Sequence, residues 1–193
     1  TGTATAKIVS GTTAVAVTVK RVVAKVEVQC TMTDSFRAKY GNGCVEVKKL
    51  TLSRGAEKSY LIDQTTSKYA TVSSSFTSAQ DAFCDKTGAS KTNAYKYNNL
   101  FYLNEKAAAA AGSRVKVLID AIYDADGNLS TTGDQMPVTY ETELTGAADG
   151  KIARNGSYKV NAKLDGLTGQ DVTLAVTVAN WDALATQDVN LGQ

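Results

Sequence analysis

Apolar and polar residues alternate along several segments of this chain with the period of two that is typical of half-buried β-strands. The clearest segment covers residues 22–30, where the even positions are apolar and Lys, Glu and Gln occupy the odd positions after Val23. The same alternation occurs in residues 13–19, 136–144, 157–164 and 173–178. Each segment is therefore predicted to form a strand with one buried and one solvated face.

Two further segments depart from simple alternation. In residues 44–52 the apolar positions change from odd to even numbers after Val47, which predicts a β-bulge near Lys48 and Lys49. Residues 115–124 carry apolar side chains on both faces, a pattern that favours a strand in the interior of a sheet.

Turn and cap signals separate the strands. The dipeptides Asn-Gly and Asp-Gly, which tolerate the positive φ of tight turns, occur at residues 42–43, 126–127, 149–150 and 155–156. Helix is expected in two short pieces, over residues 105–111 after an Asn104 cap and in a turn over residues 78–83. This balance predicts an all-β fold, an antiparallel β-sandwich with one or two short helices.

The length of 193 residues suits a single sandwich domain over residues 1–193. Residues 1–12 are expected to be a linker. No stretch has the pattern of a signal peptide or of a membrane-spanning segment, and the opening Thr-Gly-Thr-Ala-Thr-Ala is typical of a mature or trimmed product.

Charge and composition argue against several classes of function. The 21 basic and 19 acidic residues are spread along the chain without a long basic block, which disfavours binding to nucleic acid or to an anionic membrane. Histidine is absent, so the commonest general base and zinc ligand are missing. Since no phosphate-binding glycine loop or nucleophile elbow occurs either, we expect no enzymatic activity and no cofactor.

Two patterns of acidic residues are candidate sites. Asp124, Asp126 and Asn128 offer the alternating oxygen donors of a calcium loop but lack the later glutamate of an EF-hand, so a β-turn is favoured. Glu141 and Glu143 could form a glycosidase pair, yet residues two apart on a strand are more often simply solvated. No metal site is assigned, and folding is expected to need no metal.

The three cysteines, Cys30, Cys44 and Cys84, cannot all pair within the chain. One interpretation is a disulfide between Cys30 and Cys44 on neighbouring strands. The favoured interpretation treats all three as small buried hydrophobic side chains.

Residues 86–99 are predicted to form a long polar surface loop. Tyr95, Tyr97 and Tyr102 lie in it or beside it and could recognise sugars or proteins. Ordinary packing of loop aromatics is the favoured interpretation.

Two stretches are similar to a known family. The first is Val-Thr-Val-Lys-Arg-Val-Val-Ala-Lys-Val-Glu-Val at residues 17–28. The second begins at residues 151–164, which contain Arg-Asn-Gly-Ser-Tyr, and continues into a strand that ends at Trp181. In this order and spacing they resemble the second domain of the fimbrillins, the type V pilus subunits of Bacteroidetes.

The resemblance implies a transthyretin-like β-sandwich in a subunit that is exported as a lipoprotein to the cell surface. In that family, proteolysis removes a strand and the subunits assemble by strand exchange, a form of β-augmentation. The implied partners are neighbouring pilus subunits, host proteins or glycans, and the outer membrane only through lipidation of the precursor. The family's lipidated cysteine and separate N-terminal domain are not visible here, so the chain corresponds to a C-terminal domain or to a short variant.

The resemblance makes residues 182–193 a candidate donor strand. One parity of the tail is mostly apolar and supplies the candidate groove-filling residues Trp181, Ala183, Ala185, Val189 and Leu191. The alternative, that the tail is the last strand of its own sheet, is equally open. Arg21 is a candidate processing site, although a structural position within a strand is favoured for Lys20 and Arg21.

These expectations combine into a structural subunit of a bacterial surface fimbria that assembles by strand exchange and supports adhesion. The alternative is a carbohydrate- or host-protein-binding module of a surface lipoprotein that uses the tyrosine-bearing loop over residues 91–102.

Overall fold

The computed structural model describes residues 14–18, 20–62, 75–81, 84–85, 96–97, 99–145, 150–168, 172–180 and 186–190. Most of the described residues belong to one large sheet, whose strands are β2 (Val23–Met32), β3 (Cys44–Ala56), β4 (Ser75–Asp81), β7 (Asn99–Asn104), β8 (Lys116–Asp124), β9 (Gln135–Glu143), β10 (Gly156–Leu164) and β11 (Val172–Asn180). Two smaller sheets pair β1 (Ala14–Thr18) with β12 (Thr186–Asn190), and β5 (Cys84–Asp85) with β6 (Lys96–Tyr97). The helix α1 (Asp34–Tyr40) connects β2 to β3.

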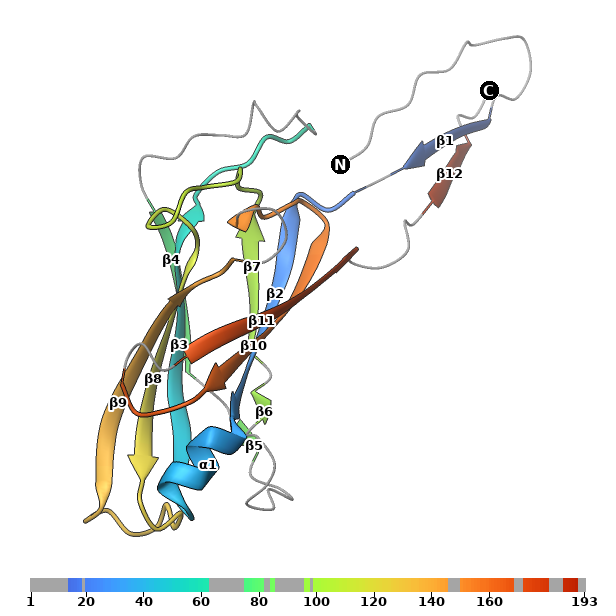
Figure 1. Cartoon of the computed structure of the whole chain (residues 1–193). Coiled ribbons are helices and arrows are strands. Elements are labelled where there is room, and N and C mark those ends of the chain that lie inside the picture. The colour runs from blue at the N-terminus through green and yellow to red at the C-terminus, as the bar shows by residue number, and fades with distance from the viewer. Residues whose placement is uncertain are drawn as a thin grey trace.

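The large sheet has two halves that are joined at one end. Its strand order is β11-β10-β2-β7-β3-β8-β9, with β4 pairing to β3 outside this path. In the described residues β7 pairs with β3 only through Ala56 and Asn104. The sheet curls, so that β10 and β11 run obliquely toward β3 in Figure 1, and β11 contacts β9 from the other end of the strand order. The inner faces of the two halves therefore enclose a common core.

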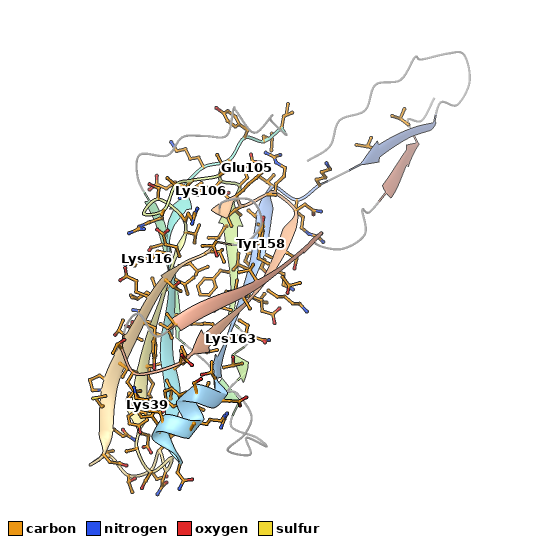
Figure 2. The ribbon with its side chains drawn as sticks, viewed as in Figure 1. Lys39, Glu105, Lys106, Lys116, Tyr158 and Lys163 are labelled. Atoms are coloured by element: carbon orange, nitrogen blue, oxygen red, sulfur yellow. The ribbon has the colours of Figure 1, made fainter. Side chains whose placement is uncertain are left out.

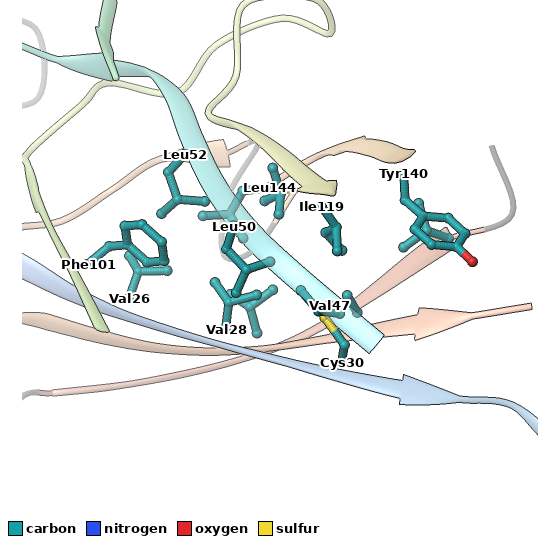
Figure 3. Close-up of a cluster of buried hydrophobic side chains, with 14 of the residues drawn as sticks. Val26, Val28, Cys30, Val47, Leu50, Leu52, Phe101, Ile119, Tyr140 and Leu144 are labelled. Carbon is teal, nitrogen blue, oxygen red and sulfur yellow. The ribbon is translucent and has the colours of Figure 1, made fainter. Parts of the chain in front are cut away.

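Side chains from both halves fill this core, as Figure 3 shows. One half contributes Val26, Val28, Cys30 and Phe101, and the other contributes Val47, Leu50, Leu52, Ile119 and Tyr140. Each fully buried aliphatic or aromatic side chain of this size stabilises the fold by about 1.5–3 kcal/mol. The hydroxyl of buried Tyr140 donates a 2.9 Å hydrogen bond to the carbonyl of Gly166, so its polar end is also satisfied.

The strands predicted from alternation are confirmed. β2 and β10 alternate strictly between buried and more exposed side chains over most of their length. The predicted bulge is confirmed by a register shift between β3 and β8 at Val47 and Lys49. β8 lies between β3 and β9, which confirms the interior position predicted from its two apolar faces.

The prediction of purely antiparallel pairing is wrong, whereas the all-β class is confirmed. β10 runs parallel to β2, with Ser157 opposite Lys25 and Leu164 opposite Met32, so the curled sheet is mixed. Alternation could not reveal this, because the face on which a side chain lies does not depend on the direction of the neighbouring strand.

The helices predicted from the sequence are wrong in position. Residues 105–111 are not helical, and the Asn104 side chain donates to the carbonyl of Ala56 at 3.0 Å instead of capping a helix. In this segment the backbone of Lys106 pairs with that of Ile152. Of the second predicted piece, residues 78–81 lie in β4, and residues 82–83 are outside the described part of the chain.

The helix α1 was not predicted from the sequence, although local signals mark both of its ends. The Thr33 hydroxyl accepts a 3.2 Å hydrogen bond from the N–H of Phe36, and Gly41 follows the helix with a φ of 59°. Phe36 is fully buried and packs against the rings of Tyr40 and Tyr123. These contacts stabilise a helix that is too short to be stable alone.

The structure confirms the predicted positive φ at some of the turn dipeptides and contradicts it at another. Gly127, Gly150 and Asn155 adopt positive φ, whereas at 42–43 the positive φ belongs to the preceding Gly41. Gly127 is also constrained by packing, since a Cβ there would overlap the carbonyl oxygen of Asn42.

Gly127→Ala is therefore expected to lower the free energy of unfolding by at least about 1–3 kcal/mol, because a strained φ and a backbone overlap act together. Urea denaturation followed by fluorescence measures this loss. The matched control is Gly133→Ala in the same loop, where an added Cβ meets nothing within 4 Å, and it should change stability by less than about 0.5 kcal/mol. Equal losses in both variants would contradict the packing described here.

Candidate assembly site

The first and the last described strands form a ribbon of their own. β1 and β12 pair antiparallel, from Ala14 opposite Asn190 to Thr18 opposite Thr186, and neither pairs with the large sheet. Figure 1 shows this terminal ribbon projecting away from the upper end of the body.

The terminal ribbon receives little apolar support. Val15 and Val17 of β1 are only half-buried, whereas Val26 and Val28 of β2 are fully buried. An isolated two-stranded ribbon is at best marginally stable in water. The pairing of β1 with β12 is therefore expected to contribute little free energy of stabilisation by itself.

The candidate donor residues fall partly on this ribbon. Val189 belongs to β12, and the remaining candidates lie outside the described residues, namely Trp181, Ala183, Ala185 and Leu191. β12 does pair within its own chain, but its partner is β1 and not a strand of the large sheet. The sequence did not predict that β12 pairs with β1, because no local pattern in residues 186–190 identifies the partner strand.

Lys20 and Arg21 connect the terminal ribbon to the body and lie in no strand, in contrast to the favoured sequence interpretation. All five arginines of the chain are described, and Arg21 is the exposed one; the others are half-buried or buried, namely Arg37, Arg54, Arg114 and Arg154. An arginine-specific protease would therefore reach Arg21 most readily.

A buried ion pair lies at the upper end of the body, next to this connection. Glu105 follows β7 and is 1% exposed, and Arg154 precedes β10 and is 9% exposed. Arg154 donates from Nε to Oε2 of Glu105 at 2.8 Å and from Nη2 to Oε1 at 2.5 Å, a bidentate arrangement. Ser59 donates to the same carboxylate at 2.9 Å, and Arg154 donates to the carbonyl of Tyr60 at 2.9 Å. The pair thus ties together β7, β10 and the segment that follows β3.

The start of β2 is anchored at the same end. The N–H of Asn155 donates to the carbonyl of Val23 at 3.1 Å. The N–H of Ala153 donates to the hydroxyl of buried Tyr158 at 2.7 Å, and Figure 2 shows Tyr158 within the body below Glu105 and Lys106. These hydrogen bonds hold the chain in the body from Val23 onward. The exposed connection to the terminal ribbon lies just before Val23.

Other candidates from the sequence lie away from this site. Glu141 pairs with Lys116, and Glu143 accepts from Arg54 at 2.8 Å, so each carboxylate is held in an ion pair of its own. Asp124 ends β8, and Asp126 and Asn128 lie in the loop between β8 and β9, at the opposite end of the body.

The cysteines and tyrosines add no chemistry to the site. Cys30 and Cys44 are buried and do not form the disulfide that the sequence left open, and burial raises the pKa of Cys30 to about 12. Cys84 belongs to β5. Tyr102 is exposed on β7, Tyr97 belongs to β6, and Tyr95 is outside the described residues.

Helical structure in the described residues includes no segment long and apolar enough to cross a lipid bilayer.

Solved structures with this fold come from Parabacteroides and Bacteroides. A candidate cell adhesion protein from Parabacteroides distasonis matches with a TM-score of 0.56 and 15% identity, over 84% of this chain and 52% of that chain. A candidate cell adhesion protein from Bacteroides eggerthii matches with a TM-score of 0.51 and 16% identity, over 86% of this chain and 57% of that chain. A fimbrial protein from Bacteroides vulgatus reaches a TM-score of only 0.48 at 14% identity, over 83% of this chain and 55% of that chain.

These matches confirm the resemblance to Bacteroidetes fimbrillin-type subunits at the level of the fold. The chain spans about half the length of the proteins it matches. No protein-family model and no curated protein matches the sequence.

The buried ion pair yields a prediction about pH and stability. Burial raises the pKa of Glu105, but hydrogen bonds from Arg154 and Ser59 and the charge of Arg154 together bring it below its ordinary value. A lowered folded-state pKa means that the stabilisation is complete at neutral pH and is lost as the pH falls below about 4. Glu105→Gln is expected to cost about 3–5 kcal/mol at pH 7, since it leaves the Arg154 charge buried without a partner.

Denaturant unfolding at pH 7 and pH 3 measures both effects. The difference in free energy of unfolding between wild type and Glu105→Gln should be smaller at pH 3 than at pH 7. Glu141→Gln, which disrupts the exposed pair with Lys116, is the control and should cost less than about 1 kcal/mol at either pH. A pH-independent gap would show that the charge of Glu105 is not what stabilises the upper end.

Proposed function

We propose that this chain, which shares its fold with candidate cell adhesion proteins of Bacteroides and Parabacteroides and resembles the fimbrillins in sequence, is a structural subunit of a bacterial surface fimbria. The observation that carries the proposal is the terminal ribbon, in which β12 pairs outside the large sheet. A subunit of a polymer needs a body that is stable by itself and a strand that can leave it. The enclosed core of the body and the separate pairing of β12 with β1 support this proposal.

The proposed assembly step is strand exchange. β12 would leave β1 and add to the sheet of a neighbouring subunit, where backbone hydrogen bonds provide affinity and side-chain pockets provide specificity. The apolar parity of the tail, with Val189 and Leu191, would fill such pockets. In this proposal a neighbouring subunit provides the receiving groove.

Cleavage after Arg21 would start the exchange. It would separate β1 from β2 without touching the body, which is fastened from Val23 onward. β1 would then be held only by its pairing with β12, a marginal interaction for so short a ribbon. Its dissociation would leave the backbone edge of β12 free for a new partner.

The proposal places the subunit at the cell surface, with neighbouring subunits as partners and host proteins or glycans as further ligands. Lipidation of a precursor would supply the link to the outer membrane. The curled mixed sheet would correspond to the transthyretin-like sandwich that the resemblance implies, and no catalytic role is assigned.

Deletion of residues 187–193 tests the donor strand. The deletion should shift the Tm of the isolated chain by no more than about 2 °C, because β12 does not pair with the large sheet. It should abolish polymerisation after protease treatment, measured by light scattering coupled to size-exclusion chromatography. A truncated chain that melts far below the parent would show that the tail supports its own body.

Neighbouring point variants sharpen this test. Val189→Asp places a charge on the apolar parity and should block polymerisation, whereas Asp188→Ala changes the polar parity and should leave it intact. Loss of polymerisation in both variants, or in neither, would contradict the proposed pocket-filling role.

Cleavage at Arg21 provides a further prediction. An arginine-specific protease should cut first after Arg21, and the remaining body should keep its Tm, because the other arginines are less exposed. Arg21→Lys keeps the charge and should resist this first cut, while Arg114→Lys should be cut like the wild type. Mass spectrometry identifies the cut, and first cleavage elsewhere would rule out Arg21 as the processing site.

A further inference from the structure

The loop between β8 and β9 gathers three carboxylates at the end of the body opposite the terminal ribbon. Asp124 is the last residue of β8, Asp126 lies in the loop, and Asp134 directly precedes β9. One carboxylate oxygen from each residue lies within 4.8 Å of the other two. Calcium–oxygen distances are about 2.3–2.6 Å, so oxygens on opposite sides of one ion are about 5 Å apart. The three groups are therefore close enough to bind the same ion.

Two of these carboxylates have a buried oxygen that makes no hydrogen bond to any described residue. Asp124 is fully buried, and Gln135 donates to its Oδ2 at 3.0 Å, but its Oδ1 has no partner. In Asp134, Oδ2 accepts from the N–H of Asp126 at 3.0 Å, and Oδ1 has no partner. A buried carboxylate oxygen without a partner is strongly unfavourable. Both orphaned oxygens belong to residues of the same cluster, which indicates a ligand that the described residues do not supply.

The charge of the cluster is also uncompensated within the described residues. Asp124, Asp126 and Asp134 form no ion pair there, in contrast to Glu105 and Glu143, which pair with arginines. Three carboxylates at this spacing repel one another, more strongly where burial excludes water. A divalent cation would remove the repulsion and satisfy the orphaned oxygens together.

Hydrogen bonds hold the loop in one shape around the cluster. The N–H of Asn128 donates to Oδ1 of Asp126 at 2.6 Å, and the Thr131 hydroxyl donates to the carbonyl of Asn128 at 2.9 Å. The side-chain amide of Gln135 donates to the carbonyl of Thr131 at 2.8 Å while it also donates to Asp124. The oxygens are therefore placed before any ion arrives, which lowers the entropic cost of binding.

We infer that Asp124, Asp126 and Asp134 form a calcium-binding site, completed by loop carbonyl oxygens and water. A donor set made only of oxygens favours calcium or magnesium over zinc and other transition metals. Calcium accepts six to eight oxygens in irregular geometry, whereas magnesium demands a near-ideal octahedron and usually keeps several waters, so a loop site with three carboxylates favours calcium. The inference does not depend on the proposed role in a fimbria.

The assignment differs from the pattern that the sequence offered. Asn128, the third donor in that pattern, instead accepts a 3.3 Å hydrogen bond from the N–H of Ser130 with its side-chain oxygen. Asp134 takes its place, because Gln135 is opposite Asp124 in the β8–β9 ladder and the loop brings the preceding residue to the same point.

Calcium titration of the full chain tests the inference. The protein is stripped with EGTA, desalted and titrated with CaCl₂ by isothermal calorimetry, and its Tm is measured with and without the ion. We expect one ion per chain and a rise in Tm of about 5–10 °C at a 100-fold excess over the Kd. Asp126→Asn and Asp134→Asn should each weaken the Kd at least tenfold. Asp120→Asn, which removes the same charge from β8 outside the cluster, should bind like the wild type.

A measurement without calcium separates loss of a ligand from misfolding. Because each Asn variant removes repulsion, both variants should melt at or above the stripped wild type in EGTA. Absence of heat and of any Tm shift up to about 10 mM CaCl₂ would overturn the site, since extracellular calcium sites bind below that range. Unchanged binding by Asp126→Asn and Asp134→Asn would overturn these ligands, and an equal Kd for MgCl₂ would overturn the assignment to calcium.

Discussion

The structure of the body follows from the burial of one apolar face of the large sheet. Its described strands carry their buried side chains on a single side, so a flat sheet would leave Val28, Leu50 and Tyr140 in water. Curling the sheet brings the β2–β10 half against the β3–β8–β9 half and removes this surface from solvent, with a bulge at Val47 that keeps the apolar phase of β3 directed inward. Two connections allow one sheet to surround its own core. One is the parallel pairing of β2 with β10, and the other is the one ladder pair that joins β7 to β3 in the described residues.

Curling leaves two open ends, and polar groups close them in different ways. At the upper end Glu105 and Arg154 neutralise each other while they bind three separate segments. At the lower end Asp124 and Asp134 have buried oxygens for which the described residues provide no partner. At the first end the two charges neutralise each other, and at the second end a cation would compensate the charge under our inference. A polymer subunit transmits force through its body, and stiffening the β8–β9 hairpin would oppose local opening of the sheet there.

The terminal ribbon lies outside this closed body, and that separation is the physical basis of the proposed function. Pairing between β1 and β12 contributes little to the core, so its loss leaves the enclosed side chains covered. The exposed Arg21 connects the two parts, next to the end that the ion pair fastens. Under the proposed function, a cut at Arg21 would release a strand and leave the body intact.

Parity along the chain by itself determined β1, β2, β3, β8 to β11 and the bulge after Val47, because these depend on residues that are close in sequence. It did not predict β4 and β7. Tertiary structure decided which strands became neighbours and in which direction, since β10 shows the same inward face whether its partner runs parallel or antiparallel. It also decided that Phe36 would stabilise a helix, that β12 would pair with β1, and that Asp134 would join Asp124 across the loop. Each of these outcomes depends on residues far apart in sequence that meet only after the sheet has curled, and no local pattern encodes such a meeting.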